Sequence, residues 1–289
     1  GVRCMMFEPD GGNVDPSGVT HAYAAGARLL GAEIERFCPV TGTEAQPDGS
    51  WIVRTEKGDI HTQWVVNAAG LWGREVAAMA GLSLPLQPTE HQYFVTEAID
   101  EVATLGRRLP SIADRDGEYY FRQEGNGLLI GAYEEKMKFW AEEGTPLDFG
   151  HELFDDDLDR IMENVMRAID RVPAAAEAGV KRVINGPMIW SPDSNALFGP
   201  VPELRNYFCC NGIIPGFSQS GPRPAGGAMD DRGRAGMGHV RLGSGTVWRL
   251  GRQGLHQGAC PRPVYAPLQD PFPERGTRRR PSRDDAPGL

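Results

Sequence analysis

Apolar and polar residues recur in patterns typical of helices and strands over the first part of the chain. A helical pattern covers residues 17–30, and residues 32–40 and 51–55 are typical of strands. Val65 and Val66 then form a short apolar run that stops at small residues, which predicts a buried parallel strand passing into a tight turn. We expect a helix to begin near Trp72, so that its N-terminal amides point at this turn.

A second group of segments, beyond Pro88, predicts a mostly antiparallel sheet. Its strands are expected at residues 91–96, 118–123, 127–133 and 181–189.

Two further patterns connect this sheet to the rest of the chain. Residues 153–169 have apolar side chains at helical spacing, and we expect Met162 and Met166 to serve the core or helix packing. Residues 207–210 predict a strand that returns to the layer of Val65. It follows a strand and turn in which Leu197 and Phe198 are expected to be core residues.

Composition limits the classes of function. The 289 residues, 40% of them hydrophobic, can bury one large or two small cores. A net charge of −9 argues against a nucleic-acid partner. The sequence has no apolar run of the roughly 20 residues that cross a bilayer, so no membrane association is expected. The five cysteines lack metal-binding spacing, so no metal site is expected, and a reducing compartment is the simplest assumption. We expect Cys209 and Cys210 to be small buried side chains.

The turn Asn67-Ala68-Ala69-Gly70-Leu71-Trp72 is the most informative motif. Its small side chains let the backbone approach a flat ligand, although alone it is equally well explained as an ordinary strand-to-helix turn. Other short motifs stand around it in a fixed order: Asp10-Gly11-Gly12, Asp15-Pro16, His91-Gln92-Tyr93, Tyr119–Glu124, Asp157-Leu158-Asp159-Arg160, Asn185-Gly186-Pro187 and Ser191-Pro192-Asp193. Over roughly residues 1–220, this set resembles the amine-oxidising flavoproteins of the D-amino-acid-oxidase type, and most strongly their dimethylglycine and sarcosine dehydrogenase branch.

The resemblance implies an α/β fold with antiparallel β structure. A partial Rossmann-like, FAD-binding domain is expected at residues 1–88, a mixed or antiparallel substrate-binding domain at 89–196, and a return segment of the FAD-binding domain at 197–220. The family's Gly-x-Gly-x-x-Gly turn, which cradles the pyrophosphate of the dinucleotide, does not occur in this sequence. We therefore expect the N-terminal third of the flavin domain to be missing.

Residues 221–289 differ in composition from the rest. They are rich in Gly, Pro and Arg, contain no Lys, and show no strand or helix period, which predicts disorder. Permitted codons for residues 256–261, read one base over, can encode Thr-Lys-Ala-Arg-Val, which resembles the sequence that follows the flavin domain in this family. We expect this tail to be an out-of-frame translation without a selected function.

The resemblance implies that His91 and Tyr120 are catalytic. Imidazole accepts a proton near neutral pH, and the tyrosine would be its partner. A lone histidine at a strand start is more often a plain core or surface residue, but the ordered motifs favour the catalytic role. One of Tyr93, Tyr119 and Arg122 could meet a substrate carboxylate, and cross-strand packing explains them equally well.

The expected flavin contacts come from two turns that are distant in sequence. They are Asn67, Ala68, Ala69, Gly70 and Trp72 in the first turn, and Gly212, Pro215, Gly216, Phe217 and Ser218 in the second. Because both turns would touch one ring, we expect Gly70 and Gly216 to face the same cleft.

By the same resemblance, the chain would oxidise the N-methyl group of dimethylglycine or sarcosine by hydride transfer to flavin N5. Oxygen or an electron-transfer flavoprotein would accept the electrons, and tetrahydrofolate would enter only through a domain absent here. The expected compartment is the cytoplasm, or the mitochondrial matrix in a eukaryote. Two alternatives are a non-catalytic relative of the pyruvate dehydrogenase phosphatase regulatory subunit type and an inactive fragment that cannot hold FAD. His91 with Tyr120 favours the enzyme over the regulatory relative.

Overall fold

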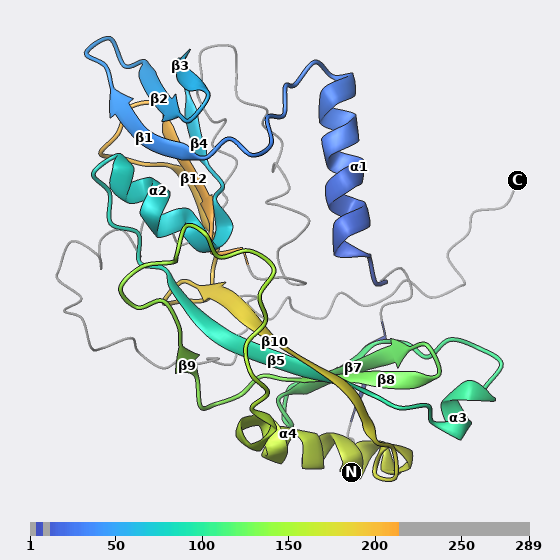
Figure 1. The fold of residues 1–289 in the computed structure, drawn as a ribbon. Helices are drawn as coiled ribbons and strands as arrows, with labels where there is room; N and C mark the ends of the chain where they lie inside the picture. The colour runs from blue at the N-terminus through green and yellow to red at the C-terminus, as the bar shows by residue number, and fades with distance from the viewer. Residues whose placement is uncertain (1–3, 8–11, 214–289) are drawn as a thin grey trace, which may run out of the picture.

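The computed structural model describes residues 4–7 and 12–213, and in this part of the chain the strands form three sheets (Figure 1). The first half contains α1 (Pro16–Leu29), β1 (Val40–Ala45), β2 (Trp51–Thr55), β3 (Gly58–Thr62), β4 (Val65–Asn67), η1 (Gly70–Trp72), α2 (Gly73–Met79), β5 (Gln87–Thr96) and α3 (Asp100–Ala103). The second half contains β6 (Ile112–Asp114), β7 (Tyr119–Glu124), β8 (Gly127–Ala132), β9 (Lys138–Phe139), α4 (Leu158–Arg171), η2 (Pro173–Ala175), β10 (Val180–Trp190), β11 (Leu197–Pro200) and β12 (Tyr207–Asn211).

The small mixed sheet has the strand order β11-β12-β4, and β12 pairs with β4 in parallel. The predicted parallel strand and the returning strand are therefore confirmed. The expectation that Val66 and Phe198 are core residues is wrong, because their side chains are 59% and 39% exposed. Side chains alternate along a strand, so Val65 and Leu197 face the core cluster while their neighbours face away from it.

An antiparallel meander, β1-β2-β3, packs against this small mixed sheet. Trp51 is almost fully buried, its ring lies 5.3 Å from that of Tyr207, and its Nε1–H donates to the backbone oxygen of Arg205 at 3.0 Å. The strand predicted at residues 32–40 is wrong, since β1 begins only at Val40. Phe37 has a φ of 52°, a left-handed conformation that interrupts extended backbone.

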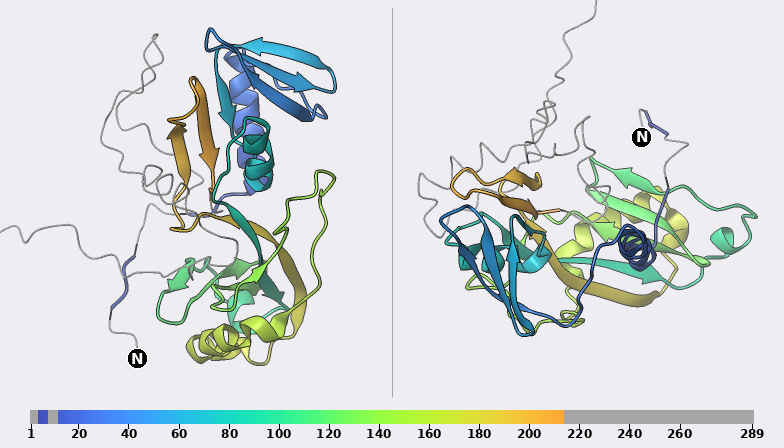
Figure 2. Two further views of the ribbon diagram at one scale, coloured as in Figure 1. Left: turned by 90° about the vertical axis from the view of Figure 1, so that its left-hand side faces the viewer. Right: turned by 90° about the horizontal axis from the view of Figure 1, so that it is seen from above.

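The six-stranded sheet has the order β10-β5-β8-β7-β6, with β9 also paired to β5, and all its pairings are antiparallel. This confirms the predicted strands that correspond to β5, β7, β8 and β10. The β5–β10 ribbon is long, because its register extends from Val180 opposite Thr96 to Trp190 opposite Gln87. Figure 2 shows this ribbon joining the end of the molecule that holds α2 and the small mixed sheet to the end that holds α4.

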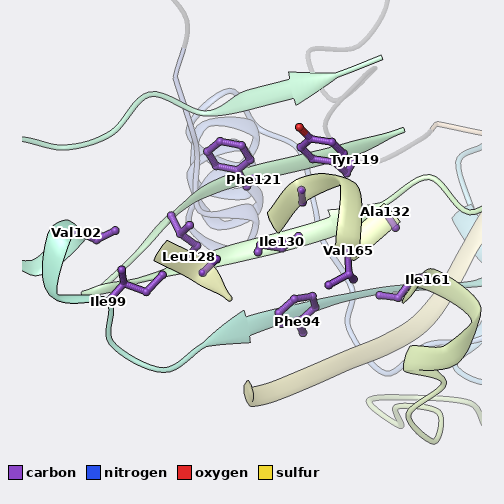
Figure 3. Packing of buried hydrophobic residues seen from close by; sticks show 12 residues of the cluster. Phe94, Ile99, Val102, Tyr119, Phe121, Leu128, Ile130, Ala132, Ile161 and Val165 are labelled. Atoms are coloured by element: carbon purple, nitrogen blue, oxygen red, sulfur yellow. The ribbon is translucent and has the colours of Figure 1, made fainter. Parts of the chain in front are cut away.

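Helix α4 covers one face of the six-stranded sheet. Phe94, Phe121 and Ile130, from three neighbouring strands, pack with Ile161 and Val165 of the helix (Figure 3). This core forms because the buried residues of α4 recur at helical spacing on one side of the helix.

The helix differs from the prediction at two points. It begins at Leu158 rather than at residue 153. Met162 and Met166 are 42% and 53% exposed, so the expectation that they lie in the core is wrong. Each follows a residue of the buried stripe by one position, and one position turns a side chain by about 100° around the helix axis.

Helix α1 confirms the predicted helix but has no buried residue. Its N-terminus is capped by Asp15, whose Oδ2 accepts from the Gly18 amide at 2.5 Å, and Pro16 occupies the first position. Just before the helix, the Asn13 side chain donates to the Ser111 hydroxyl at 2.8 Å, which links this segment to the loop before β6. None of the helices in the described ranges is long and apolar enough to cross a membrane.

Candidate functional site

His91 and Tyr120 lie on the same face of the six-stranded sheet, the face opposite α4. Tyr93 of β5 and Tyr120 of β7 are both in register with Gly131 of β8, which lies between them. His91 precedes Tyr93 by two residues, so its side chain points to the same side. The two residues belong to different predicted strands, and the strand register places both side chains on one face.

Tyr133 connects these two residues. The Tyr133 ring lies 6.2 Å from the His91 ring at an interplanar angle of 26°, and 5.4 Å from the Tyr120 ring. These separations are typical of aromatic contacts. His91, Tyr133 and Tyr120 therefore form one aromatic row. Sequence analysis did not single out Tyr133, although its place two residues after Gly131 puts it on the same face.

Gly131 allows Tyr120 to lie across the sheet. A Cβ at this position would overlap the phenol ring, including the hydroxyl. Burial raises the pKa of Tyr120 far above its ordinary value, and the neighbouring Tyr133, Tyr93 and Glu134 raise it further. The Tyr120 hydroxyl is therefore protonated at neutral pH and can donate a hydrogen bond.

His91 is joined to a buried carboxylate. Its Nδ1 lies 3.0 Å from Oε2 of Glu134, and the other oxygen of Glu134 accepts from Nη1 of Arg160 at 3.0 Å. The side chains of Glu134 and Arg160 are only 5% and 7% exposed. A second carboxylate, Glu90, lies 3.7 Å from Arg160 and 2.9 Å from Lys138. Sequence analysis missed Glu134, because a contact across 43 residues leaves no local pattern.

His91, Tyr133 and Glu134 also line a small pocket together with Trp190. Its volume of about 30 Å³ suits a water molecule. Pockets that enclose a drug-sized ligand measure roughly 300 to 1,000 Å³. The pocket is therefore too small to enclose a ligand of amino-acid size.

The three residues considered for carboxylate recognition separate in the structure. Tyr119 lies on the opposite face in the core, where its hydroxyl donates to Asp114 at 3.0 Å, so of the two roles left open for it the structure favours packing. Arg122 is on the same face as Tyr120 and forms an ion pair with Glu124 at 2.7 Å. Tyr93 and Arg122 are the two that share the face of His91.

The turn after β4 is fixed from within by Asn67. Its Oδ1 accepts from the Ala69 amide at 3.1 Å, and its Nδ2 donates to the Gly73 oxygen at 2.9 Å. Both polar atoms are thus used inside the protein, so this side chain shapes the turn. Ala68 and Gly70 are exposed, and Gly70 has a φ of 56° with open space on the side where a Cβ would project.

Two contacts tie the turn to the rest of the fold. Trp72 donates through Nε1 to the Pro146 oxygen at 2.8 Å. Arg74 donates to the side chain of Gln87 at 3.3 Å. Because His91 follows Gln87 by four residues on β5, it lies roughly 13 Å further along the strand.

The second predicted turn is described only at its start. The Asn211 side chain donates to the backbone oxygen of Asn67 at 2.9 Å, so the carboxyl ends of β12 and β4 meet. Gly212 is buried beside Leu86 and has a φ of 66°. The other predicted contacts, Pro215, Gly216, Phe217 and Ser218, lie outside the described residues, as does the expected approach of Gly70 to Gly216.

The cysteines and acidic residues offer no second site in the described part of the chain. No group of three His, Cys, Asp or Glu side chains there could hold a metal ion. Cys209 is buried, and this burial raises the pKa of its thiol to about 11. The expectation that Cys210 is also buried is wrong, because Cys210 is partly exposed. A thiol with a raised pKa is a poor nucleophile, so Cys209 is a packing residue.

Comparison with known proteins places this geometry in a family. A family model described as FAD dependent oxidoreductase matches residues 1–222. Human mitochondrial dimethylglycine dehydrogenase is 46% identical over 225 residues, which are 76% of this chain and 26% of that protein. Human mitochondrial sarcosine dehydrogenase is 36% identical over 227 residues, 77% of this chain and 24% of that protein. The chain thus spans about a quarter of the length of these relatives.

A solved structure shows the same fold. The L-proline dehydrogenase of P. horikoshii superimposes with a TM-score of 0.55 at 26% identity, over 69% of this chain and 50% of that one. The mixed α/β architecture with antiparallel sheets is therefore that of the D-amino-acid-oxidase type. With a family match over most of its length, the chain belongs to the FAD dependent oxidoreductases.

Proposed function

We propose that this chain carries the substrate face of an FAD-dependent oxidoreductase that oxidises an N-methyl group of dimethylglycine or sarcosine. The observation that carries the proposal is the aromatic row of His91, Tyr133 and Tyr120 on the face of the six-stranded sheet opposite α4. The similarity to dimethylglycine and sarcosine dehydrogenases supports it.

The residues present fit one part of FAD. The exposed Ala68 and Gly70 leave the backbone of the first turn open to a flat ring, and Asn67 holds that turn in shape. The 289 residues contain no Gly-x-Gly-x-x-Gly turn for the pyrophosphate. When bound next to this turn, FAD would supply the hydride-accepting chemistry that the protein side chains lack.

The chain's own residues would prepare the substrate for that step. An N-methyl amine must lose its ammonium proton before a hydride can leave its methyl group, and a ring nitrogen of His91 can accept this proton. The faces of Tyr133 and Tyr120 suit a methylated ammonium group, which aromatic rings attract. The Tyr120 hydroxyl, kept protonated by its raised pKa, would donate to the substrate and fix its orientation.

Tyr93 and Arg122 are the proposed partners of the substrate carboxylate, since both lie on this face. The electron acceptor, oxygen or an electron-transfer flavoprotein, and any tetrahydrofolate would bind outside the residues discussed. A second candidate applies to the 289 residues taken alone: without a Gly-x-Gly-x-x-Gly turn, they would keep the substrate face but hold FAD poorly.

The test is substrate binding followed by NMR, which does not need the flavin. Dimethylglycine or sarcosine should shift the ring signals of His91 and Tyr120 in a saturable way, and glycine, which lacks the methyl groups, should bind much more weakly. His91→Ala and Tyr120→Phe should each weaken binding roughly tenfold, as expected for one lost hydrogen bond to a charged group. If neither compound shifts these signals at millimolar concentration, the proposed substrate class is wrong.

A further inference from the structure

We propose that Glu134, held by Arg160, is a positioning residue that decides which ring nitrogen of His91 carries the proton. The importance of that choice rests on the function proposed for His91, but the choice itself follows from the described geometry. It concerns Nδ1, which lies 3.0 Å from Oε2 of Glu134.

The carboxylate of Glu134 has one oxygen for each neighbour. Oε1 accepts from Nη1 of Arg160 at 3.0 Å, and Oε2 faces His91. Only 5% of the Glu134 side chain and 17% of the His91 side chain are exposed, so water does not compete freely for either group. A guanidinium can only donate, so a carboxylate that accepts from Arg160 with one oxygen presents its other oxygen to His91 as an acceptor. The His91 nitrogen that faces it must therefore be the donor.

Arg160 keeps this carboxylate from turning. Its Nε pairs with Oδ2 of Asp157 at 3.2 Å, and its Nη1 also donates to the backbone oxygen of Glu90 at 3.3 Å. A guanidinium has donors and no acceptor. It therefore fixes both its own orientation and the acceptor role of the Glu134 oxygen in front of it.

The sheet provides the opening for this contact. β5 and β8 pair over only three positions, Tyr93 to Val95 of β5. His91 lies beyond the end of that pairing, and Glu134 follows the end of β8. The carboxylate can thus contact His91 with one oxygen while its other oxygen accepts from Arg160 of α4.

With Nδ1 protonated, the other ring nitrogen, Nε2, keeps its lone pair. It can accept the proton of a substrate amine, and the imidazolium that forms would have the negative charge of Glu134 at hydrogen-bonding distance. The opposite tautomer would present an N–H to the amine and could not accept its proton. Glu134 is thus expected to act on the reaction through His91, without touching the substrate.

The Glu134→Gln variant gives a sharp test, because Arg160 can only donate. The amide oxygen should turn to Arg160, which leaves the amide NH2 group facing Nδ1 of His91. Nδ1 must then accept, so the proton should move to Nε2. The ¹⁵N spectrum of the histidine rings, recorded on the purified full chain labelled at histidine, distinguishes the two tautomers. Assignment uses the signals lost in His91→Asn.

In the unsubstituted chain we expect the Nδ1–H form of neutral His91 to exceed the Nε2–H form at least tenfold, roughly the effect of one charge-assisted hydrogen bond. Glu134→Gln should invert that ratio. The double variant Glu134→Gln with Arg160→Met should restore the Nδ1–H form, because the amide is then free to turn its oxygen to His91. Structural damage alone would not restore it. Glu135→Gln, at the exposed neighbouring residue, is the matched control and should change nothing.

An excess of the Nε2–H form in the unsubstituted chain overturns the proposal, and this measurement does not depend on any variant of Glu134 or Arg160. A ratio that Glu134→Gln leaves unchanged overturns it as well. Failure of the proposed function is a separate result, since it would appear as absent binding of dimethylglycine and sarcosine while the tautomer stays as expected.

Discussion

Helices α1 and α4 each have 14 residues, yet they are placed very differently. Helix α4 buries Ile161, Asn164, Val165 and Ala168 against the six-stranded sheet, whereas α1 buries no residue, and Leu29 at its end is 89% exposed. Both are recognisable as helices from local sequence. The difference shows that local pattern defines a helix, while only long-range contact makes it part of a core.

The contrast extends to the two regions that contain these helices. The six-stranded sheet has one face filled by a core and the other carrying His91, Tyr133 and Tyr120. On the cofactor side, the small mixed sheet leaves Val66 largely exposed, and the first turn depends mainly on Asn67 for its shape. We therefore expect the region that holds the proposed substrate face to be stable by itself, and the region with the proposed flavin contacts to bind FAD weakly.

The largest effect should be on flavin affinity. The pyrophosphate turn of the family supplies two or three charge-assisted contacts of roughly 1.5 to 3 kcal/mol each, and this sequence lacks it. The affinity of the 289 residues taken alone for FAD should be about a thousandfold or more below that of a relative with the turn. The purified chain should thus be nearly colourless. Flavin absorbance at near-stoichiometric occupancy after gel filtration would show that the Asn67–Trp72 segment suffices to hold FAD. The expected difference between the two regions would then be wrong.

The next effect compares the two helices directly. Ile161 is fully buried, so Ile161→Ala should lower the free energy of unfolding by about 2 to 5 kcal/mol. Leu29→Ala, in the exposed helix, should change it by less than about 0.5 kcal/mol. Urea unfolding of both variants measures the difference. Equal losses would mean that α1 packs as tightly as α4 does.

A smaller effect is expected at Gly131. In Gly131→Ala the new Cβ would overlap the Tyr120 ring, so the ring must leave its place across β8. Unfolding free energy should fall by roughly 1 to 3 kcal/mol, as in other overpacked sites, and the Tyr120 ring signals should shift. Gly26→Ala is the control, because nothing lies near a Cβ there, and in a helix it should stabilise by about 0.5 to 1 kcal/mol. An unshifted Tyr120 in Gly131→Ala would contradict the aromatic row.

The smallest effect concerns acid stability on the core face. The Gly117 amide donates to Asp114, and this bond, followed by contacts from Tyr119 and Arg171, lowers the carboxyl pKa below its ordinary value. A lowered folded-state pKa stabilises the protein above the ordinary value of 3.8, and this contribution disappears as the pH falls through the folded-state pKa. Asp114→Asn should therefore lower the unfolding free energy by up to about 1 kcal/mol at pH 7, and by less near pH 3.

Unfolding of Asp114→Asn in urea at the two pH values measures this change. Asp116→Asn, at an exposed residue two positions away, is the control. If Asp114→Asn lowers the unfolding free energy by the same amount at both pH values, Asp114 stabilises the fold through packing and not through its charge.

Much of the fold could be predicted from the sequence because it is encoded locally. The alternating segments of β5, β7 and β8, the capped start of α1, and the change from Val65 to small residues all depend on neighbours in the chain. The shared face of His91 and Tyr120 also followed from strand period once the strands were placed.

The rest depends on long-range packing, which no local pattern contains. The exposure of Val66 and Met162 follows from which face the core covers, and the left-handed backbone at Phe37 ends a segment whose composition favours a strand. Glu134 reaches His91 only because β5 and β8 stop pairing before that point, so its part in the site could not be read from spacing.

The β5–β10 ribbon also determines the order in which this chain can fold. Its end pair joins Gln87 to Trp190, so β5 cannot complete its ladder until a segment about a hundred residues later exists. At a synthesis rate of about 5 to 20 residues per second, β5 waits roughly 5 to 20 seconds on the ribosome with this edge unpaired. Throughout that interval the strand that holds His91 offers its backbone to other chains, which makes the nascent protein most prone to aggregate before β10 emerges.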